Sequence, residues 1–365
     1  MSFYNLSAKA YLLLQDGTVF EGVAFGAKGS AMGEVVFNTS MTGYQQLLTD
    51  PTNMGQLVVQ TFPSIGDVGV NSTDDESDIV AVSGYIVREW CAKPSNFRCE
   101  GDLNAYMEKR GIVGIHSIDT RALTRILRDR GVMNGIITTE NVYEQKDALI
   151  RQLCSLKNES SPCKVSTKEI REFKAENAKH TVAVYDFGCR KYLIDRLLER
   201  GCDVKLLPAL TSAQELRELA PDGILLSNGP ENPDASVEIV SNLAEIAKLG
   251  IPMFGVCLGH QLLALSQGGT IEKHKYGHHG GQPVLDLELG RTFVTAQNHC
   301  YAISSIPENA GKITHINAND KTCEGIRYSG INAFSVQFLP EVHSDPLDHS
   351  YLLDAFVEMM ERNDA

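Results

Sequence analysis

Short apolar runs alternate with amphipathic stretches along the second half of the chain, and this alternation restricts the fold more than any other feature. Apolar runs typical of buried strands occupy residues 182–186, 204–207, 223–227 and 251–256. Helical periodicity appears between them, most clearly over residues 190–200. Strands and helices that alternate at this spacing predict a doubly wound, mostly parallel sheet. In such sheets, functional groups gather at the carboxyl ends of the strands.

The first half of the chain has a different pattern, in which short β-rich runs dominate. Residues 10–14 and 19–22 flank an Asp16-Gly17 turn, which predicts a β-hairpin. Further strands and helices are predicted at these positions: strands over 34–37, 57–61, 79–82 and 84–87, and helices over 103–110 and 120–130. We therefore expect a mixed α+β domain with much antiparallel pairing over residues 1–150.

Residues 151–179 differ from both halves, because they are rich in Lys, Glu and Ser. We interpret this stretch as the end of a charged helix followed by an inter-domain linker. A long surface loop within one domain is the alternative. The expected organisation is an N-terminal domain over 1–150, a linker over 151–179 and a C-terminal α/β domain over 180–365.

Composition excludes some classes of function. Of the 365 residues, 46 are acidic and 33 basic, so the net charge is −13, which disfavours a nucleic-acid-binding role. The nine cysteines form no CxxC pair and show no zinc-ligand spacing. No signal peptide or membrane-spanning apolar run is apparent, so we expect a cytoplasmic protein with reduced thiols and no membrane partner.

The apolar run 251–256 leads into a Gly-x-Cys-x-Gly turn formed by Gly255, Cys257 and Gly259. Glycines on both sides of a nucleophile let strand and helix approach closely. A thiol at a helix N-terminus has a lowered pKa, which favours the thiolate. The amide of Leu258 is then free to donate to an oxyanion. The alternative is an inert, buried cysteine at the end of a strand.

The segment 255–261, Gly-Val-Cys-Leu-Gly-His-Gln, resembles the nucleophile motif of class I glutamine amidotransferases. The resemblance implies that Cys257 attacks the side-chain amide of glutamine and releases ammonia. A γ-glutamyl thioester would then be hydrolysed to glutamate. Ser227-Asn228-Gly229-Pro230 resembles a further motif of this class, and its Gly229 amide would be the second oxyanion donor. By itself this tetrapeptide is also typical of an ordinary turn.

Other segments narrow the resemblance to the small subunits of carbamoyl phosphate synthases. They are residues 276–281 and 297–299 in the second half, and 37–45, 48–51 and 118–125 in the first. The family resemblance implies a large-subunit partner that carries ATP and Mg²⁺, no cofactor on this chain, and a role in arginine or pyrimidine biosynthesis. It also implies a set of glutamine-binding positions: Ser40, Gly229, Glu231, Leu258, Gln261, Asn298, Cys300 and Tyr301. The adjacent His278 and His279 invite a metal interpretation, but no further ligand keeps suitable spacing, so we expect no metal.

The chain departs from the family pattern at three positions. The family carries a His-Pro-Glu sequence near its C-terminus, whose histidine moves protons and whose glutamate orients that histidine. Leu339 stands at the histidine position and Glu341 at the glutamate position. Glu231 and Cys300 each replace a glycine of the family. Leucine can do no proton chemistry, so the resemblance implies an altered catalytic site around Cys257.

These departures leave three functions open. The first is a working glutaminase subunit that feeds ammonia to the large subunit. The second is a glutaminase-impaired scaffold that supports ammonia-dependent synthesis by the same partner. The third is a stand-alone amidase or a glutamine-binding regulator. Of the nearby histidines, His343 and His299 are the possible substitutes for the missing base, whereas His260 is expected to point elsewhere along the helix.

Overall fold

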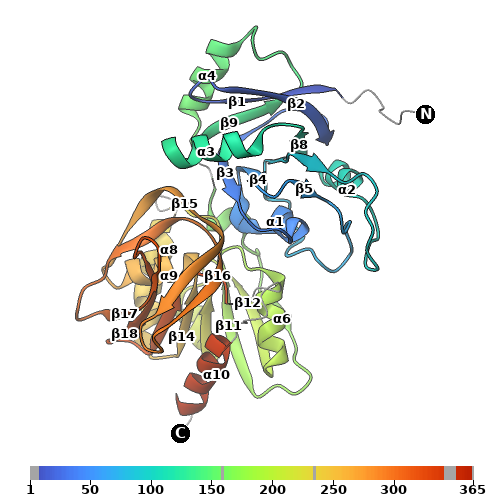
Figure 1. Ribbon diagram of the computed structural model, residues 1–365. Helices are drawn as coiled ribbons and strands as arrows, with labels where there is room; N and C mark the ends of the chain where they lie inside the picture. Colours follow the sequence, from blue (N-terminus) through green and yellow to red (C-terminus); the bar gives the residue numbers. More distant parts are fainter. Residues whose placement is uncertain (1–7, 158–159, 233–235, 341–350, 364–365) are drawn as a thin grey trace. The chain divides into compact units, whose positions relative to one another are not determined.

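The computed structural model describes residues 8–157, 160–232, 236–340 and 351–363 (Figure 1). The chain divides into two compact units, Met1–Glu159 and Ser160–Ala365. Each unit has its own apolar core. Within the described ranges, no helix combines the length and apolar character needed to cross a membrane.

The first unit is built on a closed β-barrel. Its strands, in their order around the barrel, are β1 (Lys9–Leu14), β2 (Val19–Gly26), β8 (Val113–His116), β6 (Gly84–Ile86), β4 (Gln56–Gln60), β3 (Ala31–Asn38) and β9 (Met133–Thr138). The β1–β2 hairpin is confirmed, but the pairs β3–β4, β4–β6 and β6–β8 are parallel. Closure gives each of these seven described strands a neighbour on both sides. Leu12, Val35, Val59 and Ile115 are among the side chains that fill the core.

Short elements and helices surround this barrel. They are α1 (Tyr44–Thr49), η1 (Pro51–Asn53), β5 (Ser64–Ile65), β7 (Glu89–Trp90), α2 (Leu103–Arg110), α3 (Thr120–Arg130) and α4 (Lys146–Ser155). The helices predicted over 103–110 and 120–130 are confirmed as α2 and α3. Asp102 and Asp119 begin them, since each carboxylate accepts a backbone N–H of the first turn at 2.9 Å.

The strand predicted over residues 79–82 is wrong. This stretch makes local and loop hydrogen bonds in place of a strand ladder. The amide of Ile79 donates to Ser77 Oγ at 3.2 Å, and the carbonyl of Ala81 accepts from Gly55 N at 3.1 Å. A serine that bonds the backbone two residues on favours a turn over an extended strand.

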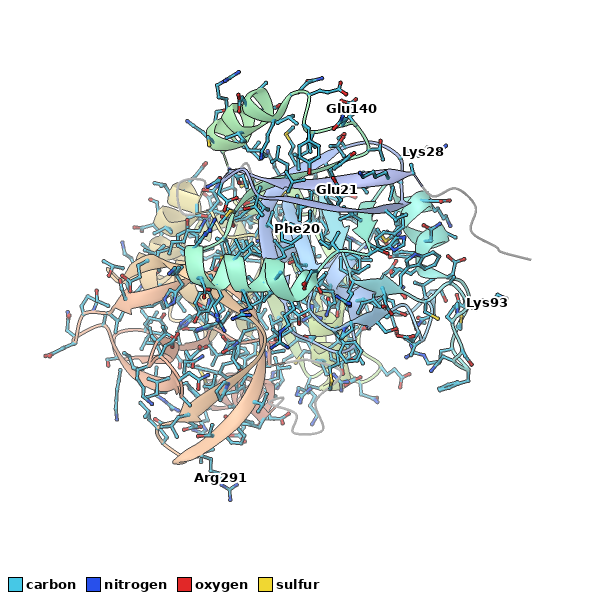
Figure 2. All side chains as sticks on the ribbon, turned by 45° about the horizontal axis from the view of Figure 1, so that its top comes forward. Phe20, Glu21, Lys28, Lys93, Glu140 and Arg291 are labelled. Carbon is cyan, nitrogen blue, oxygen red and sulfur yellow. The ribbon has the colours of Figure 1, made fainter. Side chains whose placement is uncertain are left out.

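Charged side chains lie on the outside of the barrel, as Glu21 on β2 illustrates (Figure 2). Glu21 pairs with Lys9 at 2.7 Å and accepts the hydroxyl of Tyr143 at 3.1 Å. β2 is partly exposed along most of its length, whereas β1 is buried on both of its faces beyond Lys9.

The stretch expected as a linker contains regular structure. Its first residues belong to α4, and α5 (Pro162–Val165) and β10 (Arg171–Phe173) follow. β10 pairs antiparallel with β12 and so forms one edge of the second sheet. The segment is polar because edge elements face solvent on one side, and this composition is easily mistaken for that of a linker.

The second unit is built on one ten-stranded mixed sheet. Its central strands are parallel: β12 (Cys202–Pro208), β11 (His180–Asp186), β13 (Gly223–Leu226), β14 (Met253–Val256) and β19 (Ala333–Val336). Beyond β19 the sheet continues with antiparallel strands: β18 (Cys323–Tyr328), β16 (Arg291–Ser305), β15 (Thr270–Asp286) and β17 (Gly311–Asn317). The predicted doubly wound sheet is therefore present, with an antiparallel extension. Arg291 lies at the turn of the long β15–β16 hairpin (Figure 2).

Helices cover both faces of this sheet. α7 (Ala213–Leu219), α8 (Val237–Ile246) and α9 (Leu258–Ser266) contribute to one apolar cluster, through residues such as Leu216, Leu243 and Leu262. α6 (Lys191–Glu199) and α10 (Tyr351–Asn363) contribute to the other. The short helix η3 (Ala247–Leu249) extends α8. This arrangement places the carboxyl ends of β13, β14 and β19 next to one another.

Candidate active site

Cys257 lies in the turn between β14 and α9, where the sequence predicts it. It has a positive φ of 53° with ψ of −106°, an uncommon conformation for a residue with a side chain. Its amide donates to the carbonyl of Val336 on β19 at 2.9 Å, which ties the turn to the neighbouring strand. The turn thus has the strained geometry of a nucleophile elbow.

The two flanking glycines are needed for close approach of backbone segments. A Cβ at Gly259 would lie 2.2 Å from the carbonyl oxygen of Leu226, and a Cβ at Gly255 would lie 2.9 Å from the carbonyl oxygen of Gly259. Both distances are too short for a side chain. The helix that carries the cysteine can therefore pack against β13 only because these positions are glycine.

The sulfur of Cys257 has two polar contacts, although the residue belongs to an apolar cluster. Its Sγ lies 3.9 Å from the carbonyl oxygen of Asn298, and Gln337 Nε2 donates to it at 3.7 Å. Leu339 belongs to the same apolar cluster as Cys257 and is 6% exposed, while Cys257 is 1% exposed. Burial of this degree is the one observation that favours the alternative of an inert cysteine.

Leu339 occupies its place through backbone pairing. Its amide donates to the carbonyl of Ala296 at 3.0 Å, so the segment after β19 lies along β16. Glu341 and His343, the other predicted residues of this segment, lie outside the described residues. An aliphatic side chain therefore stands in the cluster that contains the thiol, at the position where the family resemblance places a base.

Gly229 and Leu258, the two predicted oxyanion donors, lie close together. Leu258 Cδ2 is 3.1 Å from the position that a Cβ of Gly229 would take. That Cβ would also lie 1.9 Å from the carbonyl oxygen of Phe187, so only glycine fits here. The loop before Gly229 is held from β11, since Phe187 N donates to Ser227 Oγ at 3.0 Å and Asn228 Nδ2 donates to the carbonyl of Gly188 at 3.1 Å.

Glu231 accepts hydrogen bonds from three groups that the sequence also assigned to the site. The amide of Cys300 donates to Oε2 at 2.5 Å, and the amide of Tyr301 lies 3.3 Å from both carboxylate oxygens. Gln261 Nε2 donates to Oε1 at 2.6 Å. Glu231, Gln261, Cys300 and Tyr301 are thus brought together, as the resemblance implies.

Gln261 links this group to the thiol. Its Nε2 also contacts Gln337 Oε1 at 3.1 Å and the carbonyl of Tyr301 at 2.9 Å. Gln337 in turn donates to Cys257 Sγ. Gln337 was not predicted as a site residue, although its place just beyond the carboxyl end of the central strand β19 is a signal that could have found it.

Asn298 and Cys300 both contact His279. Asn298 Oδ1 lies 2.8 Å from His279 Nδ1, and His279 Nε2 lies 3.6 Å from Cys300 Sγ. His279 therefore helps to hold the β16 segment that contributes Asn298, Cys300 and Tyr301 to the site.

Both ring nitrogens of His299 are engaged, whereas Nε2 of His260 is buried without a hydrogen-bond partner among the described residues. His299 Nδ1 contacts the carbonyl of Tyr301 at 2.7 Å, and its Nε2 contacts Gln297 Oε1 at 2.9 Å. Burial, with the nearby His278, holds the pKa of His299 well below its ordinary value. His260 is fully buried and its Nδ1 contacts Ser335 Oγ at 2.7 Å. Burial, with His315 nearby, lowers the pKa of His260 to about 3.

Ser40 lies in the first unit, in the loop after β3. Its amide donates to Asn38 Oδ1 at 2.8 Å and its carbonyl accepts from Gln60 Nε2. These contacts fix the local backbone. The contact of Ser40 with glutamine that the resemblance implies stays a prediction.

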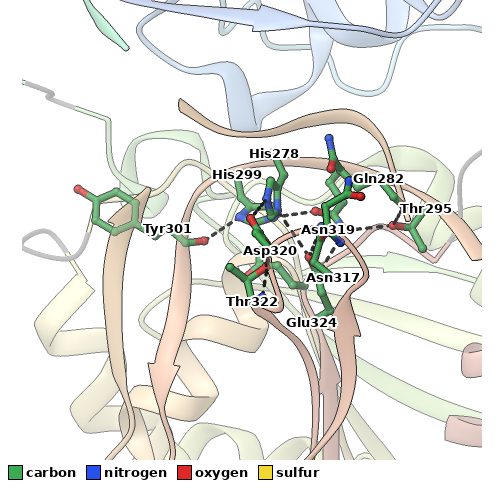
Figure 3. Close-up of polar contacts among 12 residues, drawn as sticks. His278, Gln282, Thr295, His299, Tyr301, Asn317, Asn319, Asp320, Thr322 and Glu324 are labelled. Atoms are coloured by element: carbon green, nitrogen blue, oxygen red, sulfur yellow. Dashed lines mark hydrogen bonds and ion pairs between the residues drawn. The ribbon is translucent and has the colours of Figure 1, made fainter. Parts of the chain in front are cut away.

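A second polar cluster surrounds His278 (Figure 3). Nε2 of His278 lies 2.8 Å from Asp320 Oδ2, and Nδ1 lies 3.5 Å from Glu324 Oε1. Burial alone would lower the pKa of His278, but the carboxylates of Glu324 and Asp320 outweigh it and raise the pKa above its ordinary value. Glu324 is fully buried and also accepts Gln297 Nε2 at 2.9 Å.

The same cluster contains the residues best suited to hold a metal ion. Ligand-type atoms of His278, His299 and Glu324 lie within 4.8 Å of one another, and so do those of His274, His278 and Asp320. Both sets use His278, whose two nitrogens already face carboxylates. A protonated imidazole between two carboxylates accounts for these contacts without a metal.

Comparison with known proteins agrees with this architecture. Residues 183–359 match the family model for class I glutamine amidotransferases. Residues 12–137 match the family model for the CPSase domain of the carbamoyl-phosphate synthase small chain. The second unit is therefore a class I glutamine amidotransferase domain. The first unit contains the CPSase domain of the carbamoyl-phosphate synthase small chain.

Full-length relatives narrow the assignment further. The chain is 45% identical to the carbamoyl phosphate synthase small chain of Clostridium perfringens over 96% of this chain and 99% of the relative. It is 43% identical to the small chain of Syntrophotalea carbinolica, over 97% of this chain and 98% of the relative. It is 42% identical to the small chain of Vibrio parahaemolyticus, over 99% of this chain and 100% of the relative. The chain belongs to the family of carbamoyl phosphate synthase small chains.

Proposed function

We propose that this chain is a glutaminase-impaired small subunit of carbamoyl phosphate synthase. It binds the large subunit, hydrolyses glutamine through a Cys257 thioester only slowly, and mainly supports synthesis from free ammonia. The large subunit supplies the ATP and Mg²⁺ chemistry, and the product serves arginine or pyrimidine biosynthesis in the cytoplasm. Family membership supports the partner and the reaction.

The observation that carries the proposal is the placement of Leu339. It is buried in the apolar cluster that contains Cys257, at the sequence position of the histidine that the family resemblance requires. An unactivated thiol is only a few per cent thiolate at neutral pH. Loss of a general acid–base typically lowers a rate by about 10²–10⁴-fold. The elbow, Gly229 and Leu258 remain in place, which supports a residual rate rather than none.

Glutamate release from glutamine tests the proposal. It is measured for the purified chain alone and after addition of a large subunit from the same source, with complex formation followed on a sizing column. We expect co-migration, together with glutamate release about 10²–10⁴-fold below that of a small chain that carries the histidine. Release at the ordinary rate would refute the impairment, and separate elution of the two chains would refute the subunit role.

A further inference from the structure

Three N–H donors converge on the carboxylate of Glu231. The amides of Cys300 and Tyr301 are consecutive along β16, and both donate to Glu231. The side-chain amide of Gln261 on α9 donates to the same carboxylate from another element. Consecutive backbone amides aimed at one point make an anion-binding concavity. The group is therefore a carboxylate-binding site, and its occupant is a side chain of this chain.

We propose that Glu231 acts as an intramolecular plug, whose carboxylate occupies the position where the α-carboxylate of a free amino acid would otherwise bind. The inference rests on the proposed function, because it takes glutamine as the ligand of this site. It adds a second obstacle to hydrolysis that is separate from Leu339. Leu339 affects proton transfer at the sulfur, whereas Glu231 affects whether the amino acid binds.

Side-chain contacts link the carboxylate site to the sulfur of Cys257. Glutamine carries a carboxylate at one end and a carboxamide at the other. The donors to Glu231 connect to the thiol through only two side chains, since Gln261 contacts Gln337 and Gln337 contacts Cys257 Sγ. A ligand whose carboxamide faces the sulfur must place its carboxylate close to donors of this kind.

The number of donors explains why the two carboxylates exclude one another. An ionised carboxylate is an acceptor only, and the amides of Cys300 and Tyr301 have one hydrogen each. A second carboxylate at the same place would compete with Glu231 for these same hydrogens and would face its charge. Binding of glutamine therefore requires Glu231 to leave. The apparent affinity for glutamine is then the affinity of the open site multiplied by the fraction of time that the site is open.

The expected size of the effect follows from tethering. A group that is held next to its site competes at a high effective concentration without any cost of association. If the plug is in place about 99% of the time, the apparent affinity for glutamine is lowered about 100-fold. Replacement of Glu231 by glycine removes the competitor and leaves all three donors intact.

Calorimetric titration of the full chain with L-glutamine tests the plug. Glu231→Gly should bind L-glutamine about 100-fold more tightly than the unmodified chain. Glu231→Gln should show a smaller gain, because its NH₂ group faces the N–H donors and weakens the plug without emptying the site. Glu238→Gln is the matched control, since Glu238 is exposed in the first turn of α8, and it should bind as the unmodified chain does.

A second ligand shows whether the carboxylate is the group concerned. Glutamine α-amide carries no charge at this position, so its affinity should rise less on Glu231→Gly than that of L-glutamine. The proposal is overturned if L-glutamine binds the unmodified chain and Glu231→Gly equally, or if both ligands gain equally. If Glu231→Gly does not fold by circular dichroism, unchanged affinity in Glu231→Gln overturns the proposal instead. Glutamate release measured in the same samples tests the proposed function separately, because binding does not depend on turnover.

Discussion

The carboxylate of Glu231 accepts the backbone N–H of Cys300 at 2.5 Å. These are two of the three positions at which the chain departs from the family pattern, so two departures from glycine lie in direct contact. The third, Leu339, lies in the apolar cluster that contains Cys257. The departures therefore fall into two groups, one at the carboxylate-binding position and one at the thiol, and they should affect different kinetic constants.

Restoring a histidine at position 339 should raise kcat. The imidazole would take the thiol proton and donate to the departing ammonia, and such groups contribute about 10²–10⁴-fold. Leu339→His should therefore raise kcat for glutamate release with little change in KM, whereas Glu231→Gly should lower KM with little change in kcat. Steady-state kinetics of both variants separate the two effects. A fall in KM with Leu339→His alone would contradict this division.

Residual hydrolysis should depend on the thiol of Cys257. Cys257→Ser should reduce glutamate release to background, because a hydroxyl is a far weaker nucleophile without an activating base. Cys154→Ser is the matched control, since Cys154 is exposed in α4 of the other unit, and it should have no effect. If Cys257→Ser retained the activity of the unmodified chain, the elbow would not be the site of reaction.

The close packing of α9 on β13 should make Gly259 intolerant of a side chain. A Cβ there would lie 2.2 Å from a backbone carbonyl that cannot move alone. Gly259→Ala should destabilise the chain by about 1–3 kcal/mol or more, as overpacking does. Gly330→Ala should be nearly neutral, because its Cβ would meet nothing within 4 Å. Urea denaturation compares the two variants. Equal urea midpoints would show that the contact between Gly259 and Leu226 leaves room for a side chain.

The His278 cluster should make stability depend on pH. The pKa of His278 is raised in the folded chain by Glu324 and Asp320, against the effect of burial. Its contribution to the free energy of unfolding is then complete below the unfolded pKa of about 6.5 and is lost as pH rises through the folded pKa. His278→Gln should therefore lower the melting temperature more at about pH 5.5 than at about pH 8.5.

The groups that face His278 are the carboxylates of Glu324 and Asp320 and the rings of His274 and His299, whose centroids lie 5.7 Å and 5.0 Å away. If the cluster were a metal site instead, its contribution to stability would increase with pH, because metal binding requires a deprotonated imidazole. Melting curves with added Zn²⁺ or with chelator distinguish the two. A marked rise in the melting temperature with Zn²⁺ at neutral pH would contradict the ion-pair interpretation.

Local features of the chain could be predicted from its sequence because they depend on neighbours along the chain. The bounds of α2 and α3 follow from capping aspartates and apolar spacing. The elbow follows from an apolar strand and two glycines around Cys257. In each case the residues that decide the structure lie within one or two turns of one another.

Features that depend on residues far apart in the sequence could not be predicted in the same way. Closure of the barrel requires β2 to pair with β8, about ninety residues along the chain, and no local pattern specifies that pairing. The family resemblance placed Glu231, Cys300 and Tyr301 in one site, but no pattern in the sequence indicated that the Glu231 carboxylate accepts the amides of the other two. The polar character of residues 151–179 concealed the edge strand β10.

The most direct test compares the two nitrogen sources in the assembled enzyme. Carbamoyl phosphate formation by the complex of this chain with its large subunit is measured with saturating glutamine and then with saturating ammonia. We predict that ammonia supports synthesis and that the glutamine-dependent rate is about 10²–10⁴-fold lower. A glutamine-dependent rate equal to the ammonia-dependent rate would contradict the account.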